Sequence, residues 1–183
     1  MAETNIATWP SYYRYWGKAK RSEDQPGDAY HLLPYHCLDV AACGYWLVKN
    51  DMFGAGKVFQ QLGFSINEGA MFFAWLLGVH DIGKFARGFQ QLNVFPDLVP
   101  PLPDKFYSCR HDSLGFWLWN ARLRGECKKQ NWSPFSTSLK RGEDFTLDQL
   151  VTLSTGHHGK PPDVMAEGSS AFHTDDIQAA KEW

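Results

Sequence analysis

The 183-residue sequence lacks the features that mark secreted, disulfide-bonded and membrane-spanning proteins. Its first residues do not form a basic start followed by an apolar run and a small-residue cleavage site, so we expect no signal peptide. The longest apolar stretch, residues 70–79, is about half of what a bilayer-spanning helix needs. The cysteines form neither a C-x-x-C pair nor a regular framework; they are Cys37, Cys43, Cys109 and Cys127. We therefore expect reduced thiols, a cytoplasmic location and no membrane partner.

Excess positive charge is also missing. Lysine and arginine together number 18 against 20 aspartates and glutamates, which gives a formal net charge of −2 and a pI of about 6.4. A domain that grips long duplex DNA unaided is normally more basic, because phosphate contacts from Lys and Arg dominate such binding. Any nucleic-acid contact is therefore expected at a local basic strip or at a metal site. The chain is long enough for one domain with a real core and too short for two comfortable ones.

Strand signals are scarce, and the patterns that are present are those of helices. Pro34 suits the first turn of a helix, and apolar residues recur at helical spacing as far as residue 49. Ser65 and Glu68 predict a capping box ahead of residues 70–77, whose apolar character on all sides predicts a buried central helix. Further helices are expected over residues 85–92, over 110–124, from a second capping box (Thr146 with Gln149) to about residue 157, and from Thr174 to the end, with loops over 96–103 and 131–144. The sequence thus predicts an all-α fold.

Histidines gather at the ends of these expected helices. Five of the seven lie there, and they are His36, His80, His111, His157 and His158. Two of these positions carry adjacent pairs, His80-Asp81 and His157-His158. Neighbouring helical residues point about 100° apart, so a mononuclear site would use both members of a pair awkwardly. A dinuclear site, with ions roughly 3.5–4 Å apart, can use both. We expect the Asp81 carboxylate to bridge two ions, and histidine-rich ligation favours Mn, Fe, Co, Ni or Zn over Mg.

Lys84 lies about one helical turn beyond the His80-Asp81 pair. An ammonium group at that position can meet a phosphate oxygen as charge builds during an in-line displacement. Gly83 is expected to allow a close backbone approach or a sharp exit from the helix. We therefore expect Asp81 and Lys84 to be catalytic.

Three further residues carry two interpretations each. Asp39, one turn after His36, either orients that imidazole or is an ordinary surface acid. Arg14 and Lys18 lie in residues 12–21, where aromatic and basic side chains alternate. Such a segment either stacks on and neutralises single-stranded DNA or is half core and half solvated face.

These residues, in this order, resemble the HD superfamily of metal-dependent phosphohydrolases. The resemblance rests on His36, on His80-Asp81 followed by Gly83-Lys84, on His111 and on His157-His158. Residues 15–18, 31–41 and 156–159 are similar to one branch, the N-terminal HD nuclease domain of the CRISPR-associated type I helicase-nuclease, most like subtype I-E. This resemblance runs over nearly the whole chain.

The resemblance implies an all-α HD-domain helical bundle with a metal site between helix ends. It implies a ligand set for two divalent transition-metal ions, namely His36, His80, Asp81, His111, His157 and His158. It also implies that the substrate is single-stranded DNA, that a helicase domain follows in the full-length protein, and that Cascade, the RNA-guided surveillance complex, recruits the enzyme.

One departure from the family pattern concerns the later part of the chain. The family has a further ligand Asp on a helix well past the double-His motif, and Asp163, Asp175 and Asp176 come too early and lack its context. Residues 1–183 are therefore expected to be an HD nuclease domain truncated before its last helices, with one ion under-ligated. The helicase domain is expected to be absent, because no Gly-rich loop ending in Lys-Ser/Thr occurs.

The expected reaction is hydrolysis of phosphodiesters in single-stranded DNA by a metal-bound water, in CRISPR interference. Two alternatives stay open. One is an HD phosphohydrolase that uses the same ligands on nucleotides, and the other is a catalytically incomplete fragment that serves as a docking module.

Overall fold

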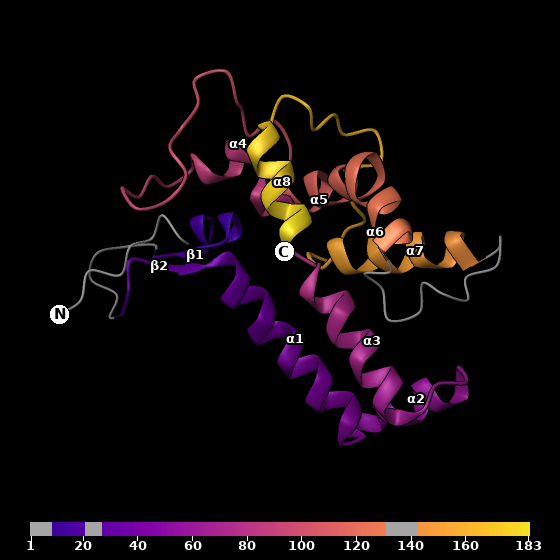
Figure 1. Cartoon of the computed structure of the whole chain (residues 1–183). Helices are drawn as coiled ribbons and strands as arrows, with labels where there is room; N and C mark the ends of the chain where they lie inside the picture. Colours follow the sequence, from indigo (N-terminus) through magenta and orange to yellow (C-terminus); the bar gives the residue numbers. More distant parts are fainter. Residues whose placement is uncertain (1–8, 21–26, 131–142) are drawn as a thin grey trace.

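A computed structural model describes residues 9–20, 27–130 and 143–183, and most of them are helical (Figure 1). Short 3₁₀ turns carry the label η, as does one π-helical stretch. In chain order the elements are η2 (Ser11–Arg14), β1 (Trp16–Ala19), β2 (Tyr30–Leu32), α1 (Leu33–Lys49), η3 (Met52–Gly54), α2 (Ala55–Gln61), α3 (Ile66–Gly78), η4 (Ile82–Phe85), α4 (Arg87–Gln90), α5 (His111–Leu118), η5 (Trp119–Leu123, π-helical), α6 (Arg124–Gln130), α7 (Glu143–Thr155) and α8 (Thr174–Glu182). The predicted all-α class is confirmed.

Helices α1 and α3 form a long arm, with α2 at its tip (Figure 1). Pro34 stands in the first turn of α1, as predicted. The predicted capping box of α3 is confirmed, because Ser65 Oγ accepts from the Glu68 amide while the Glu68 carboxylate accepts from the Ser65 amide. A Cβ on Gly44 would lie 2.3 Å from Leu77 Cδ1, so the absence of a side chain there lets the two helices approach closely.

The remaining helices pack around the upper end of this arm (Figure 1). The helix predicted over residues 110–124 is present, and it continues through the π-helical stretch into α6. The predicted start of α7 is wrong, because the helix already begins at Glu143 and Thr146 lies inside it. The predicted cap of α8 is wrong by one residue: His173 is the N-cap and pairs with Asp176 in a capping box. Most of the predicted loop over 131–144 lies outside the described residues.

A buried charge cluster fastens α8 to the segment that carries η4 and α4. Asp176 is fully buried and accepts hydrogen bonds from the Arg87 guanidinium at 2.8 and 3.1 Å and from the Tyr15 hydroxyl at 2.8 Å. Burial, followed by the neighbouring Asp176 charge, raises the pKa of Tyr15 far above its usual range, so the phenol stays a donor. These contacts position η4 against the first strand and the last helix.

The sequence patterns predicted neither helix α2 nor the two-stranded hairpin. Strands β1 and β2 are antiparallel, with Trp16 opposite Leu32 and Lys18 opposite His31, so Gly17 forms a bulge. Among the described residues no single helix has the length and apolarity to cross a bilayer. Two helical segments joined by a sharp bend, Met52–Gln61 and Ile66–Phe85, meet those criteria only when taken together.

Candidate metal centre

The histidines singled out in the sequence meet with Asp81 where four helical segments come together. His36 lies in the first turns of α1, His80 and Asp81 follow α3, His111 opens α5, and His157 and His158 follow α7. Every one of these ligand candidates therefore lies at or near a helix end, as the sequence predicted.

Gly83 lets two of these segments approach. A Cβ on Gly83 would lie 1.8 Å from the His111 carbonyl oxygen and 2.5 Å from the Gly115 nitrogen, and backbone atoms cannot yield to it. Only glycine therefore permits η4 to run against α5 at this distance. The contact brings Asp81, two residues before Gly83, to the side of His111.

The first group of ligand candidates is buried and converges on one oxygen of Asp81. The Oδ2 atom of Asp81 lies 2.9 Å from His36 Nε2, 3.1 Å from His80 Nε2 and 2.7 Å from Lys84 Nζ. The potential ligand atoms of His36, His80 and Asp81 all lie within 4.8 Å of one another, as binding to one ion requires.

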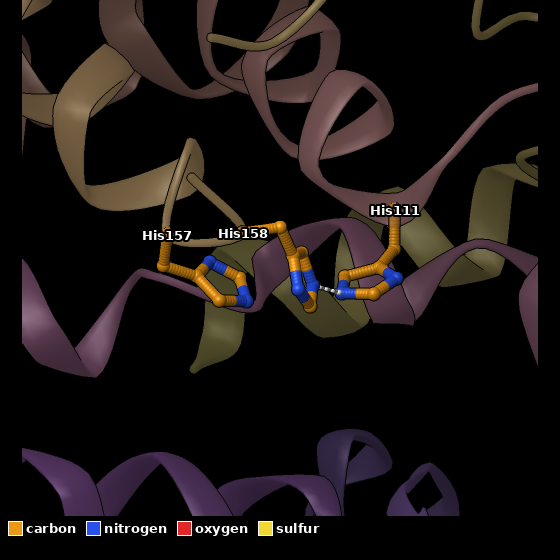
Figure 2. A group of neighbouring side chains, drawn as sticks. All are labelled: His111, His157 and His158. Atoms are coloured by element: carbon orange, nitrogen blue, oxygen red, sulfur yellow. Dashed lines mark hydrogen bonds between the residues drawn. The ribbon is translucent and has the colours of Figure 1, made fainter. Parts of the chain in front are cut away.

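The second group is more exposed and faces the other oxygen of the same carboxylate. The Oδ1 atom of Asp81 lies 3.4 Å from His111 Nε2 and 3.4 Å from His157 Nε2. Figure 2 shows the three imidazoles of this group, with His158 Nε2 2.8 Å from His111 Nε2. The potential ligand atoms of His111, His157 and His158 again lie within 4.8 Å of one another. One carboxylate thus stands between two sets of imidazoles.

The hydrogen bonds behind these rings show that the residues fit metal ions. His80 Nδ1 lies 2.6 Å from the Leu77 carbonyl oxygen, which can only accept. A neutral imidazole carries one N–H, so Nδ1 donates it and the Nε2 lone pair faces Asp81 Oδ2. A lone pair pointing at a carboxylate oxygen needs a cation between them. His157 repeats this arrangement, with Nδ1 3.3 Å from the Ser154 carbonyl oxygen.

Two further observations point the same way. The Nε2 atoms of His111 and His158 lie 2.8 Å apart, so one of them carries the proton of a hydrogen bond, and a metal ion would take the place of that proton. Among the described residues no group donates a hydrogen bond to Asp81 Oδ1, although this oxygen is buried. A buried carboxylate oxygen without a donor is costly unless a cation meets it. The donor set of imidazoles and one carboxylate suits transition-metal ions.

The charges around the centre favour the protonation states that metal binding needs. Burial opposes ionisation of Asp81, but its contacts with the His36 and His80 imidazoles and the Lys84 charge outweigh it and hold the pKa of Asp81 far below its usual range. Burial, together with the Lys84 and neighbouring histidine charges, lowers the pKa of His111 to about 4. Burial and neighbouring histidine charges also lower the pKa of His157. A charged carboxylate and neutral imidazoles are the forms that ligate metals.

Lys84, predicted to be catalytic, lies in the centre with only 6% of its surface exposed. Its ammonium bonds to Asp81 Oδ2 and to the Gly17 carbonyl oxygen at 2.9 Å. Tyr107, in contrast, was not predicted. Its hydroxyl accepts from the His111 amide and lies 3.3 Å from His111 Nδ1, so it orients that ring. Tyr107 precedes His111 by four residues, but no sequence pattern indicates that the turn between them brings the two together.

Several other predicted residues lie apart from the centre. Asp39 accepts from His31 at 3.0 Å, while His36 binds Asp81, so of the two interpretations of Asp39 the structure supports the surface acid. Arg14 and Lys18 are not brought together: Arg14 lines a pocket of about 420 Å³ beside Arg87, and Lys18 lines a separate groove of about 300 Å³.

The aromatic part of the same segment belongs largely to the core. Tyr15 and Trp16 are buried, which supports the interpretation of residues 12–21 as half core and half solvated face. Of the acids considered and set aside in the sequence, Asp176 binds Arg87, and the Asp163 carboxylate accepts from the Met165 amide. Neither belongs to the two ligand groups.

Comparison with known proteins agrees with this geometry. Residues 16–183 match the family model described as Cas3, HD domain. The chain is 30% identical over 193 residues to the CRISPR-associated endonuclease/helicase Cas3 of Escherichia coli (strain K12), an alignment that covers 92% of this chain and 21% of that protein. The chain therefore spans about a fifth of that relative's length. No solved structure matches it. With its histidines and Asp81 arranged as two ligand groups around one carboxylate, and with the family model matched from residue 16 to residue 183, the chain belongs to the family of Cas3 HD domains.

Proposed function

We propose that this chain is a metal-dependent nuclease domain that hydrolyses phosphodiester bonds of single-stranded DNA in CRISPR interference. The observation that carries the proposal is the single Asp81 carboxylate, with its two oxygens facing two separate groups of imidazoles. Such a carboxylate is suited to bridge two ions, and paired ions are a recurrent solution for phosphodiester hydrolysis. The family membership and the name of the E. coli relative, an endonuclease, support the same reaction class.

The proposal assigns one ion to each group of ligands. His36, His80 and Asp81 would hold one, and His111, His157 and His158, with the other Asp81 oxygen nearby, would hold the second. The ions are of the Mn, Fe, Co, Ni or Zn kind, since imidazole ligands disfavour Mg. When bound, the ions supply Lewis acidity to the phosphoryl oxygens and lower the pKa of the attacking water.

The chain's own residues orient these ligands and supply a fixed positive charge. The Leu77 and Ser154 carbonyl oxygens hold His80 and His157 in the tautomer that presents Nε2 to the centre. The Lys84 ammonium directs two of its three N–H groups to Gly17 and Asp81, which leaves one for a non-bridging phosphate oxygen.

Access to the centre favours a polymer over a mononucleotide. His157 and His158 are exposed, so the second group opens to solvent at the surface rather than at the bottom of an enclosed nucleotide pocket. Lys18, which is exposed, would meet the strand in its own groove outside the centre, and Arg14 would meet it in the other pocket. A helicase domain in the longer protein and the Cascade complex are proposed partners, in line with the resemblance and with the endonuclease/helicase name of the relative.

The test is cleavage of circular single-stranded DNA with added Mn²⁺, Co²⁺, Ni²⁺ or Mg²⁺, beside an Asp81→Asn variant and an Asp39→Asn control. Asp39 is an exposed carboxylate of α1 whose partner is His31 and not a ligand candidate, so its replacement should leave cleavage unchanged. We expect cutting with the transition metals that is lost in Asp81→Asn alone. Hydrolysis of nucleotides without cutting of DNA would instead identify a nucleotide phosphohydrolase. Absence of both activities in a metal-loaded protein would identify an incomplete domain that serves for docking.

A further inference from the structure

Gln90 is a buried residue whose side chain joins the first strand to the catalytic segment. Its Oε1 atom accepts from the Trp16 amide at 3.0 Å, and its Nε2 atom donates to the Trp16 carbonyl oxygen at 3.0 Å. The second N–H of Nε2 meets the Lys84 carbonyl oxygen at 2.7 Å. Gln90 has 3% of its surface exposed, and both polar atoms of its side-chain amide have hydrogen-bond partners. The amide pairs with the N–H and C=O groups of Trp16 as the backbone of a neighbouring strand would.

The residue after Trp16 is where this arrangement reaches the metal centre. Gly17 forms the bulge of β1, and its carbonyl oxygen accepts from Lys84 Nζ at 2.9 Å. A Cβ on Gly17 would lie 3.0 Å from both Leu33 Cα and His36 Cβ, so the bulge is packed tightly against α1. Gln90 therefore holds the backbone of Lys84 and of Trp16, while the next carbonyl along β1 holds the tip of the Lys84 side chain.

The Lys84 ammonium also bonds to an Asp81 oxygen that a metal ion would need as a ligand. It lies 2.7 Å from Asp81 Oδ2, the oxygen on which His36 and His80 converge. Ammonium and metal ion thus compete for one carboxylate oxygen. The Gly17 carbonyl gives the ammonium another acceptor, and it can do so only while β1 keeps its place against Gln90.

We propose that Gln90 is a positioning residue that acts through Lys84. The amide fixes the Gly17 carbonyl, which shares the Lys84 ammonium with Asp81 and so weakens the hold of that ammonium on Oδ2, the oxygen that a metal ion would take. The same restraint keeps the ammonium beside the site of phosphate binding. This inference rests on the proposed function of the centre, but it makes a claim about metal affinity that does not depend on DNA cleavage.

The experiment is a double-mutant cycle on Co²⁺ affinity, read from the visible absorption of the ion during titration of the metal-free protein. The variants are Gln90→Met, Lys84→Met and the two combined. Gln90→Met releases the Gly17 carbonyl, so the Lys84 ammonium bonds to Asp81 alone and more tightly, and Co²⁺ should bind about tenfold more weakly, in the range found for residues that support metal ligands. Lys84→Met removes the competing charge, so binding should be tighter than in the wild type. In the Lys84→Met background, Gln90→Met should change the affinity less than about twofold, because its target is gone.

Gln91 provides the matched control. It is the neighbouring glutamine and also makes two backbone hydrogen bonds, to Leu102 and Lys105, but these lie on a loop away from the centre. Gln91→Met should leave Co²⁺ affinity unchanged. If Gln90→Met prevents folding, Gln90→Glu keeps the shape and the Oε1 acceptor while losing both Nε2 donors, and the same cycle applies.

The outcomes separate the inference from its alternatives. Equal weakening by Gln90→Met with and without Lys84 would show a merely structural role and overturn the proposal. Unchanged affinity in both Gln90 variants would overturn it as well. A wild-type protein that binds Co²⁺ but does not cut DNA would refute the proposed function, while the cycle would still decide the role of Gln90.

Discussion

The buried Asp176 carboxylate allows a prediction whose magnitude follows from the structure. Its Oδ1 atom accepts from two guanidinium nitrogens of Arg87 and from the Tyr15 hydroxyl, and its Oδ2 atom accepts from the Arg87 and His173 amides. Asp176→Asn replaces one oxygen by an NH₂ group that faces donors. At least two donors then lose their acceptor, at about 1–3 kcal/mol each, and the Arg87 charge loses its counter-ion. We expect a loss of about 3–5 kcal/mol in the free energy of unfolding, as for other broken buried ion pairs.

The assay is urea unfolding in EDTA, followed by tryptophan fluorescence. Asp175→Asn is the control, because this neighbouring carboxylate is 78% exposed and its loss should cost less than about 0.5 kcal/mol. A loss below about 1 kcal/mol for Asp176→Asn would refute the reasoning that the Asp176–Arg87 pair is buried where water cannot replace the lost carboxylate oxygen. Under conditions where the variant is folded, its Co²⁺ affinity should equal that of the wild type. A weakened affinity would show that the contacts of Asp176 with Arg87 also support the metal centre through η4.

Three further outcomes are expected. In EDTA the folded protein binds fewer protons at His111 than the unfolded chain between pH 6.5 and about 4, so the free energy of unfolding should fall by up to about 3 kcal/mol on acidification through this window. His111→Gln should flatten this pH dependence in calorimetry at several pH values, and an unchanged slope would count against His111 as its source. Gly83→Ala should lower the free energy of unfolding by about 3 kcal/mol or more in the same urea assay, because the added methyl group would overlap backbone atoms. Gly78→Ala, with open space around the new Cβ, should change it by no more than about 1 kcal/mol, and similar losses for both variants would contradict the close approach at Gly83. His158→Gln should abolish the weaker step of a Co²⁺ titration and leave the tighter step, which belongs to the His36 group. The step at the His158 group is the weaker one because water competes for the ion at that exposed site. Loss of both steps together would indicate a single shared ion.

The ligand candidates and the main helices could be predicted because local patterns encode them. The Ser65–Glu68 capping box and Pro34 are signals within a few residues of the helix starts that they specify. The histidines could be singled out because metal chemistry restricts which side chains serve as ligands, and their places at helix ends limited which of them could meet.

Other features could not be predicted because they depend on contacts distant in sequence. The β1–β2 hairpin is short, lacks a long alternating pattern and is held by the Gln90 side chain, which lies 74 positions after Trp16. Tertiary contacts of this kind override local propensity. The start of α7 was misplaced because the Thr146–Gln149 spacing fits a capping box equally well when it lies within a helix. Asp39 was ambiguous because the acceptor preferred by His36, Asp81, comes from another helix end.

The arrangement of the ligands also bears on how the domain would unfold. His36, His80-Asp81, His111 and His157-His158 come from four stretches of chain that are far apart in sequence. Two ions that share Asp81 would tie those stretches together as a set of covalent cross-links would, and they would close several long loops of the unfolded chain at once. Chelation would then loosen the junctions between helices before it melts the helices themselves. The first sites of proteolysis after metal removal should accordingly lie beside the ligands, while the α1–α3 arm resists longest.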